Sequence, residues 1–199
     1  MSLESLAILL ALLFAAYLLG SVNFSILLFR LLRLEDPRTC YSGNPGVSNV
    51  YRMKGPIWAG LVLLLDIGRA GLIAWLALHY AALPWVPFIC LSLVVGNRYP
   101  IFHGFRGGKG VSNFLGFVAV LSPIGAAISA VAWVLVFALL RRSFLGSVAM
   151  IAINGVAMVV ACQVQPLAWI GSIHVVLFIL WAHRQNFRQW LAERKNNKN

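Results

Sequence analysis

Long apolar runs dominate the chain, and short polar stretches separate them. The runs cover residues 5–32, 56–83, 85–96, 111–121, 124–140, 144–161 and 167–182. A helix needs about 20 apolar residues to cross a bilayer, and fewer if it is broken or lines a cavity. The pattern therefore predicts an all-α, polytopic membrane protein with seven transmembrane helices, two of them short. A five-crossing arrangement, in which both short segments dip back, fits the pattern equally well.

The basic residues predict an orientation. With the N-terminus outside, the inner segments hold Arg33, Arg38, Arg52, Lys54, Arg98, Arg106, Lys109, Arg141, Arg142 and the tail from Arg184. The outer turns at 79–84, 122–123 and 162–166 contain no lysine or arginine. Because basic loops stay in the cytoplasm, we expect an outside N-terminus and a cytoplasmic C-terminus. The first apolar run is too long for a cleaved signal peptide.

Composition supports a membrane protein. Of the 199 residues, 61% are hydrophobic and 11% charged, and the mean hydropathy is +0.85. These values exclude a disordered chain, a disulfide scaffold and an ordinary nucleic-acid-binding domain. The net charge of +11 fits loops that face anionic lipid. Cysteine and histidine show no metal-site spacing, so we expect no metal and no cofactor. Without an internal repeat, residues 1–199 are expected to form a single domain.

The stretch SGNPGVSNVYR has the composition of an anion site. Gly43 and Gly46 allow positive φ, so that successive backbone amides can converge on an anion. Ser48 or Asn49 could cap a short helix, and Arg52 would then reach a phosphate. A turn followed by a lipid-facing arginine is an equally good interpretation.

The stretch GFRGGKGVS is the richest in candidate chemistry. Gly107, Gly108 and Gly110 surround Lys109, and a helix is expected to begin near Ser112. Free amides, a helix N-terminus and an ammonium group together favour phosphate binding. The spacing is not that of a Walker A loop, which argues against nucleotide hydrolysis. The alternative is a flexible basic loop that rests on anionic lipid.

Two pairs of polar residues lie inside apolar runs. Ser21 and Ser25 are one turn apart on one helix face, where small residues more often serve helix packing. Asp66 and Arg69 are three residues apart, and a structural ion pair is the favoured interpretation.

The last apolar run ends in a His183/Asn186 pair that shares one face at the inner surface. Such a pair is more often an interfacial anchor than a catalytic pair, and Phe187 and Trp190 favour anchoring. No Ser/His/Asp order or zinc-protease pattern occurs, and acidic residues are scarce. The sequence therefore offers many anion binders and few general bases.

Four motifs occur in a familiar order. They are the GS-x-x-F step from Gly20, the SGN-x-G-x-S-NV-x-R run that ends at Arg52, the deep Asp66, and the FRGGKGV run around Lys109. Together they resemble the bacterial acyl-phosphate:glycerol-3-phosphate acyltransferases, the PlsY family. The resemblance covers nearly the whole chain.

The resemblance implies transfer of a fatty acyl group from acyl-phosphate to the sn-1 hydroxyl of glycerol 3-phosphate, which gives lysophosphatidic acid in phospholipid synthesis. The enzyme would be a monomer in the bacterial inner membrane, its site facing the cytoplasm. The residues implied to hold phosphate and act in catalysis are Arg52, Lys109, His183 and Asn186. Those implied to line the pocket are Ser21, Asn44, Ser48, Asn49 and Ser147, beside the glycines at 43, 46, 107, 108 and 110.

One departure from the family pattern keeps other functions open. Asn97 stands where the family usually has histidine, and asparagine cannot carry a proton as histidine does. The chain could therefore be a catalytically weak paralogue or one with another acceptor. A binding or transport protein for a phosphorylated solute is the third interpretation, which the scarcity of ionisable residues in the spans disfavours.

Overall fold

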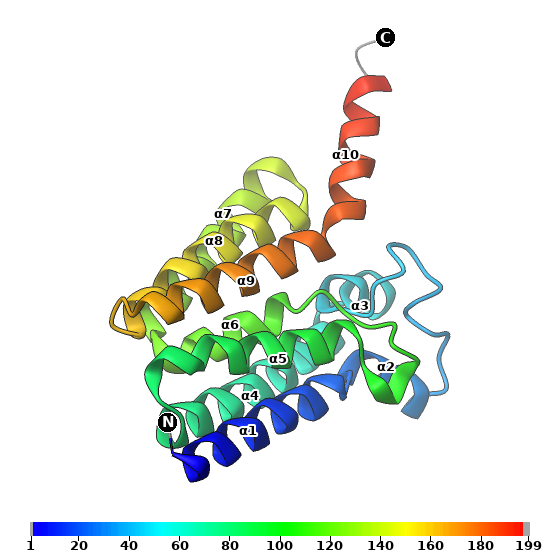
Figure 1. The fold of residues 1–199 in the computed structure, drawn as a ribbon. Coiled ribbons are helices and arrows are strands. Elements are labelled where there is room, and N and C mark those ends of the chain that lie inside the picture. Colours follow the sequence, from blue (N-terminus) through cyan, green and yellow to red (C-terminus); the bar gives the residue numbers. More distant parts are fainter. Residues whose placement is uncertain (1, 197–199) are drawn as a thin grey trace.

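The computed structural model describes residues 2–196, which form helices and connecting segments (Figure 1). In chain order the helices are α1 (Leu3–Ser21), α2 (Phe24–Leu31), α3 (Val47–Lys54), α4 (Pro56–Tyr80), α5 (Val86–Arg98), α6 (Val111–Leu121), α7 (Pro123–Leu140), α8 (Ser143–Ala161), α9 (Pro166–Ala182) and α10 (Arg184–Asn196). Short 3-10 turns lie at Leu83–Trp85 and Ile101–His103.

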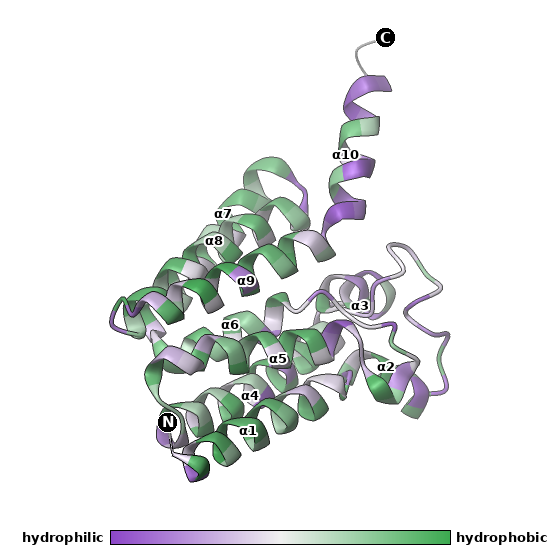
Figure 2. Cartoon of the chain, viewed as in Figure 1, coloured by the Kyte–Doolittle hydropathy of each residue, from purple (hydrophilic) through white to green (hydrophobic). Residues whose placement is uncertain are grey.

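The apolar helices form two groups that pack on each other. Helices α1, α4, α5 and α6 form one group, and α7, α8 and α9 form the other (Figure 1). Helix α5 contacts both α1 and α9, and α6 joins α4 to α7 and α8. Helices α2 and α3 and the long connections lie at the end where α9 passes into α10, far from the N-terminus (Figure 1). Polar residues concentrate at this end and on α10 (Figure 2).

The protein is an integral, multi-pass membrane protein. By length and composition, five segments within residues 2–196 can cross a bilayer, or six if α9 and α10, bent by 51°, form one span. The predicted count of seven exceeds even the larger of these counts because it includes α6. That helix has 11 residues and is about 16 Å long, whereas the hydrocarbon core is about 30 Å thick.

The exposed fractions of the side chains distinguish a central helix from lipid-facing ones. On α5, Ile89, Leu93 and Val94 are fully buried. On α7, Val131 and Leu135 expose 58% and 57% of their surface. Exposed apolar side chains on such a scale are stable in hydrocarbon, because lipid tails provide the apolar surroundings that a soluble core would otherwise supply.

Helices α1 and α5 approach to backbone contact at two glycines. A Cβ atom on Gly20 would overlap the Leu93 carbonyl, and one on Gly96 would overlap the Tyr17 carbonyl. Beside them, the Ser21 hydroxyl donates to the Tyr17 carbonyl at 2.9 Å. The packing interpretation of the small residues around Ser21 is therefore confirmed.

The first apolar run is not one helix. Helix α1 ends at Ser21, and α2 begins at Phe24, where the Asn23 side chain accepts a hydrogen bond from the Ile26 amide at 3.0 Å. The expectation that Ser21 and Ser25 share one helix face is wrong, because the two residues lie on different helices.

The Asp66–Arg69 ion pair is confirmed, and it does more than neutralise charge. The Arg69 guanidinium lies 2.8 Å from Asp66 and donates to the Asn113 side chain of α6 at 2.6 Å. It also donates to the carbonyls of Leu19, Gly20 and Val22, where α1 ends. An unpartnered carbonyl in hydrocarbon costs several kcal/mol, so this one side chain stabilises the break.

We expect Arg69→Gln to destabilise the protein by about 3–5 kcal/mol, because it leaves the Asp66 carboxylate and the α1 carbonyls without their cation. Thermal unfolding of the purified protein in detergent measures the change. Arg188→Gln, at an exposed position of α10, is the control and should leave the melting temperature unchanged. Equal melting temperatures for the two variants would contradict this role.

Gly20→Ala should destabilise the α1–α5 contact by about 1–3 kcal/mol, because its methyl group has no space. Gly60→Ala in α4 is the matched control, since no atom beyond the adjoining backbone of α4 lies within 4 Å of its Cβ position. Alanine is the better helix former, so the control should be neutral or slightly stabilising. The same thermal unfolding measurement compares the two.

Candidate functional site

Lys109 and Asn186 meet where α9 passes into α10. Lys109 lies in the connection between α5 and α6, and its ammonium group donates to the Asn186 side-chain oxygen at 2.6 Å. Asn186 belongs to the first turn of α10. The fold thus joins two predicted site residues that are 77 positions apart in the sequence.

The surroundings of Lys109 are basic. Burial, and after it the charges of Arg98 and Arg52, together lower the pKa of Lys109 to about 8. The positive charge of Arg52 therefore acts on the Lys109 ammonium group. Within residues 2–196, the arginines in ion pairs are Arg38, Arg69 and Arg142. Lys109, Arg98 and Arg52 are therefore not neutralised by a carboxylate.

Gly107 and Gly108, which precede Lys109, hold the loop against α5, so their backbone amides are not free. Gly107 donates to the Arg98 carbonyl at 3.1 Å, and Gly108 donates to the Asn97 carbonyl at 2.9 Å. A Cβ atom on either glycine would collide with residues at the end of α5. The expected cradle from these two amides is therefore wrong, because the amides already hold the loop against α5.

Gly110 turns the chain into α6. Its φ of 87° lies in the left-handed region, and a Cβ there would meet Val94. Helix α6 begins at Val111, one residue before the predicted start, without a side-chain cap. The positive end of this helix consequently lies directly after Lys109.

Arg98 is a basic residue of this region that the sequence did not single out. It donates to the Gly107 carbonyl at 3.3 Å, and its guanidinium lies 6.0 Å from the centre of the Trp181 ring. Its position in the last turn of α5, just before the glycine-rich loop, was the available signal.

The second motif forms α3. The predicted cap at Ser48 or Asn49 is wrong, because Gly46 occupies the N-cap position without a side-chain hydrogen bond. Of the two glycines, Gly43 has the expected positive φ of 62°, whereas Gly46 has an ordinary φ of −125°. Arg52 lies exposed on this helix.

Asn49 is buried and anchors the preceding loop. Its side-chain amide donates to the carbonyls of Pro37 and Cys40, at 2.8 and 3.2 Å. Ser48, the next residue toward the N-terminus, is exposed, and Asn44 is half-buried beside Gly46. Asn49 therefore positions the loop in front of Arg52.

His183 and Ser147 are both buried. The His183 Nδ1 atom lies 2.8 Å from the Ile179 carbonyl, which can only accept, so Nδ1 carries a hydrogen. In the neutral ring, Nε2 is then an acceptor. The Ser147 hydroxyl donates to the Ser143 carbonyl at 3.1 Å and lies 3.4 Å from the Trp133 indole nitrogen.

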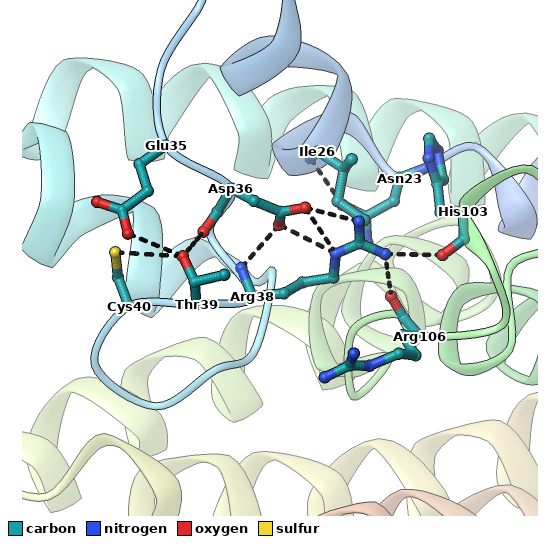
Figure 3. A network of polar contacts seen from close by, with 9 residues as sticks. All are labelled: Asn23, Ile26, Glu35, Asp36, Arg38, Thr39, Cys40, His103 and Arg106. Atoms are coloured by element: carbon teal, nitrogen blue, oxygen red, sulfur yellow. Dashed lines mark hydrogen bonds and ion pairs between the residues drawn. The ribbon is translucent and has the colours of Figure 1, made fainter.

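Arg38 fixes the two polar loops to each other (Figure 3). It lies 2.6 Å from the Asp36 carboxylate and donates to the carbonyls of His103 and Arg106, at 2.7 and 3.4 Å. The hydrogen bonds from Arg38 hold the pKa of Asp36 below its usual value. Loop 32–46 is thereby joined to the turn that leads to Lys109.

A cavity of about 200 Å³ opens between the two glycine-containing motifs. Gly43 and Pro45 line it from one motif, and Arg106 and Gly107 from the other. Gln185, next to Asn186, lines it as well. Among the cations without an acidic partner, Arg98 and Arg106 line this space, whereas Arg52 and Lys109 do not. Guanidinium groups beside such a space can bind an anion, and a phosphate matches their hydrogen-bonding geometry.

Comparisons with known proteins agree on one family. The profile of the family described as "Glycerol-3-phosphate acyltransferase" matches residues 10–193. The Methylobacillus flagellatus glycerol-3-phosphate acyltransferase is 41% identical over 188 residues, which cover 89% of this chain and 90% of that protein. The Azotobacter vinelandii protein of the same name is 39% identical over 184 residues, with 92% and 95% covered.

Solved structures give the same result. The crystal structure of PlsY, an integral membrane glycerol 3-phosphate acyltransferase, in its glycerol 3-phosphate form has a TM-score of 0.86 and 31% identity. The match covers 94% of this chain and 93% of that one. Its lysophosphatidic acid form has a TM-score of 0.83 over the same shares.

The low pKa of Lys109 predicts a pH dependence for anion binding. As pH rises from 8 to 9.5, Lys109 loses its proton and its positive charge, so orthophosphate affinity should fall about tenfold. Orthophosphate keeps the same charge over this range. Equilibrium binding of labelled orthophosphate measures the affinity, and Lys109→Arg, which stays charged, should flatten the profile. An unchanged profile in that variant would exclude Lys109 as the titrating group.

Proposed function

Because the chain belongs to the glycerol-3-phosphate acyltransferase family, we propose that it transfers a fatty acyl group from acyl-phosphate to the sn-1 hydroxyl of glycerol 3-phosphate. The products are lysophosphatidic acid and inorganic phosphate. The observation that carries the proposal is the contact of Lys109 with Asn186 in a region that also holds Arg52 and Arg98. Both substrates carry phosphate, and this region offers cations without acidic partners.

Arg52 and Lys109 hold the phosphate groups in this proposal. Arg52 is exposed on α3 and can form two parallel hydrogen bonds to phosphate, whereas Lys109 supplies a point charge. Ser48 and Asn44 lie on the Arg52 side of the site. Asn49 supports the site indirectly, since its side chain already donates to a carbonyl of the loop that precedes α3.

His183 and Asn186 act from the α9–α10 junction. Asn186 orients Lys109, and the His183 Nε2 atom accepts a hydrogen bond from the acceptor hydroxyl. Ser147 lines the site from α8, and the Ser21 hydroxyl, 3.5 Å from the Gly96 carbonyl, helps to keep α1 and α5 together behind it.

The chemistry does not require a strong protein base. The hydroxyl oxygen bonds to the acyl carbon, the bond from that carbon to the phosphate oxygen breaks, and the hydroxyl proton passes to the released phosphate. Phosphate is a good leaving group, so positioning and stabilisation of the developing negative charge supply most of the rate enhancement.

We place this single domain, residues 1–199, in a bacterial inner membrane with the site facing the cytoplasm. The polar end of the bundle holds the basic loops, and the N-terminus lies at the other end (Figure 2). Basic loops stay on the cytoplasmic side. A chain that passes between these ends through α1, α4, α5, α6, α7, α8 and α9 crosses seven times, with α5 and α6 as the two short crossings.

Arg52→Gln and Lys109→Gln should each lower the transfer rate roughly 100- to 1,000-fold, because each removes a charge that stabilises the transition state. The assay incubates purified protein with acyl-phosphate and labelled glycerol 3-phosphate and measures lysophosphatidate. Lys54→Gln, two residues from Arg52 on α3, is the control and should keep the parent rate. Full transfer by either test variant would refute its role, and absence of product from the parent would overturn the proposed activity.

A further inference from the structure

A larger basic cavity shares Arg38 and Arg106 with the cavity between the two glycine-containing motifs. Its volume is about 370 Å³, and Arg30, Asp36, Arg38, Phe102, His103 and Arg106 line it. None of the residues assigned to acyl transfer lines this cavity.

Two of the three arginines in this cavity keep an uncompensated charge. Asp36 is bound to Arg38 through contacts of 3.0 and 2.6 Å, so this pair is neutral overall (Figure 3). Within residues 2–196, the side chains of Arg30 and Arg106 form neither an ion pair nor a hydrogen bond. The lining therefore carries two net positive charges, a setting that attracts anions.

His103 adds an unmet hydrogen-bond donor to the lining. Its side chain is 5% exposed, and its Nε2 atom accepts from the Asn23 backbone amide at 3.4 Å. In the neutral ring Nδ1 then carries the hydrogen, and that atom has no partner among the described residues. A buried donor without a partner is destabilising, and a bound acceptor would remove that cost.

Exposed apolar side chains adjoin the cavity lining in the sequence, and we call them its apolar rim. Phe102 exposes 55% of its surface, and its neighbour Ile101 exposes 48%. Leu31, next to Arg30, exposes 82%. A polar cavity with such a rim fits an anionic group at the membrane border.

We propose that this cavity is a second phosphate-binding site, separate from the site at Arg52 and Lys109. Arg30 and Arg106 bind the phosphate oxygens, the His103 ring donates to them, and the Arg38–Asp36 pair forms the rigid wall. The phosphate belongs either to an anionic lipid headgroup, for which the apolar rim is suited, or to a free phosphate.

The test uses the full-length protein with Arg52→Gln and Lys109→Gln, so that the site proposed for acyl transfer no longer contributes. Binding of orthophosphate is measured by equilibrium binding in detergent. Binding of phosphatidylglycerol, with phosphatidylcholine as the neutral reference, is measured by counting lipids retained on the purified protein in native mass spectrometry. Arg30→Gln is then added, and Arg33→Gln is the matched control, because Arg33 is exposed three residues away and does not line the cavity.

Arg30→Gln should weaken one of the two ligands at least tenfold, whereas Arg33→Gln should not. Loss of orthophosphate binding identifies a free phosphate as the ligand, and selective loss of phosphatidylglycerol identifies a lipid headgroup. Arg106→Gln should reproduce the result, and thermal unfolding checks that each variant is folded. If neither ligand responds to Arg30→Gln or Arg106→Gln, the second site does not exist. That result leaves the proposed transfer activity untouched, because Arg30 and His103 line this cavity and not the one between the two glycine-containing motifs.

Discussion

Inside hydrocarbon, a helix can break only where other groups satisfy its free carbonyls, and Arg69 does this for α1. Its guanidinium reaches the carbonyls of Leu19, Gly20 and Val22 while it is bound to Asp66 and Asn113. Helices α1, α4 and α6 are thereby joined at one point. A lone arginine at this depth would be costly, and the ion pair with Asp66 reduces that cost.

The break lets the chain leave the bundle and form the polar end. Asn23 caps α2, and its backbone amide donates to His103, so the first break lies against the turn after α5. Arg38 then ties the following loop to the same turn. The Gly107 and Gly108 amides hold the loop of Lys109 against α5. Each link restricts where Lys109 can lie, which places it beside Asn186.

The scarcity of acidic residues gives this end its chemistry. The chain has 16 basic residues and five acidic ones. Asp36, Asp66 and Glu193 are each paired with an arginine. The carboxylates are thus used to stabilise the fold, and Arg52, Lys109 and Arg98 keep their charge for an anion. A phosphate leaving group suits such a site, because charge stabilisation counts for more than proton abstraction.

The sequence by itself determined the helices from α4 to α9, the polar end and the Asp66–Arg69 pair, because the length of an apolar run, charge and i, i+3 spacing are local. It also carried the family motifs. Only the tertiary structure decided the other features. They are the break at Val22, the hydrogen bonds of the Gly107 and Gly108 amides, the contacts by which Arg38 joins two loops, and the contact of Lys109 with Asn186. Each depends on a partner that is distant in sequence, and a glycine-rich stretch looks the same whether its amides are free or already bonded.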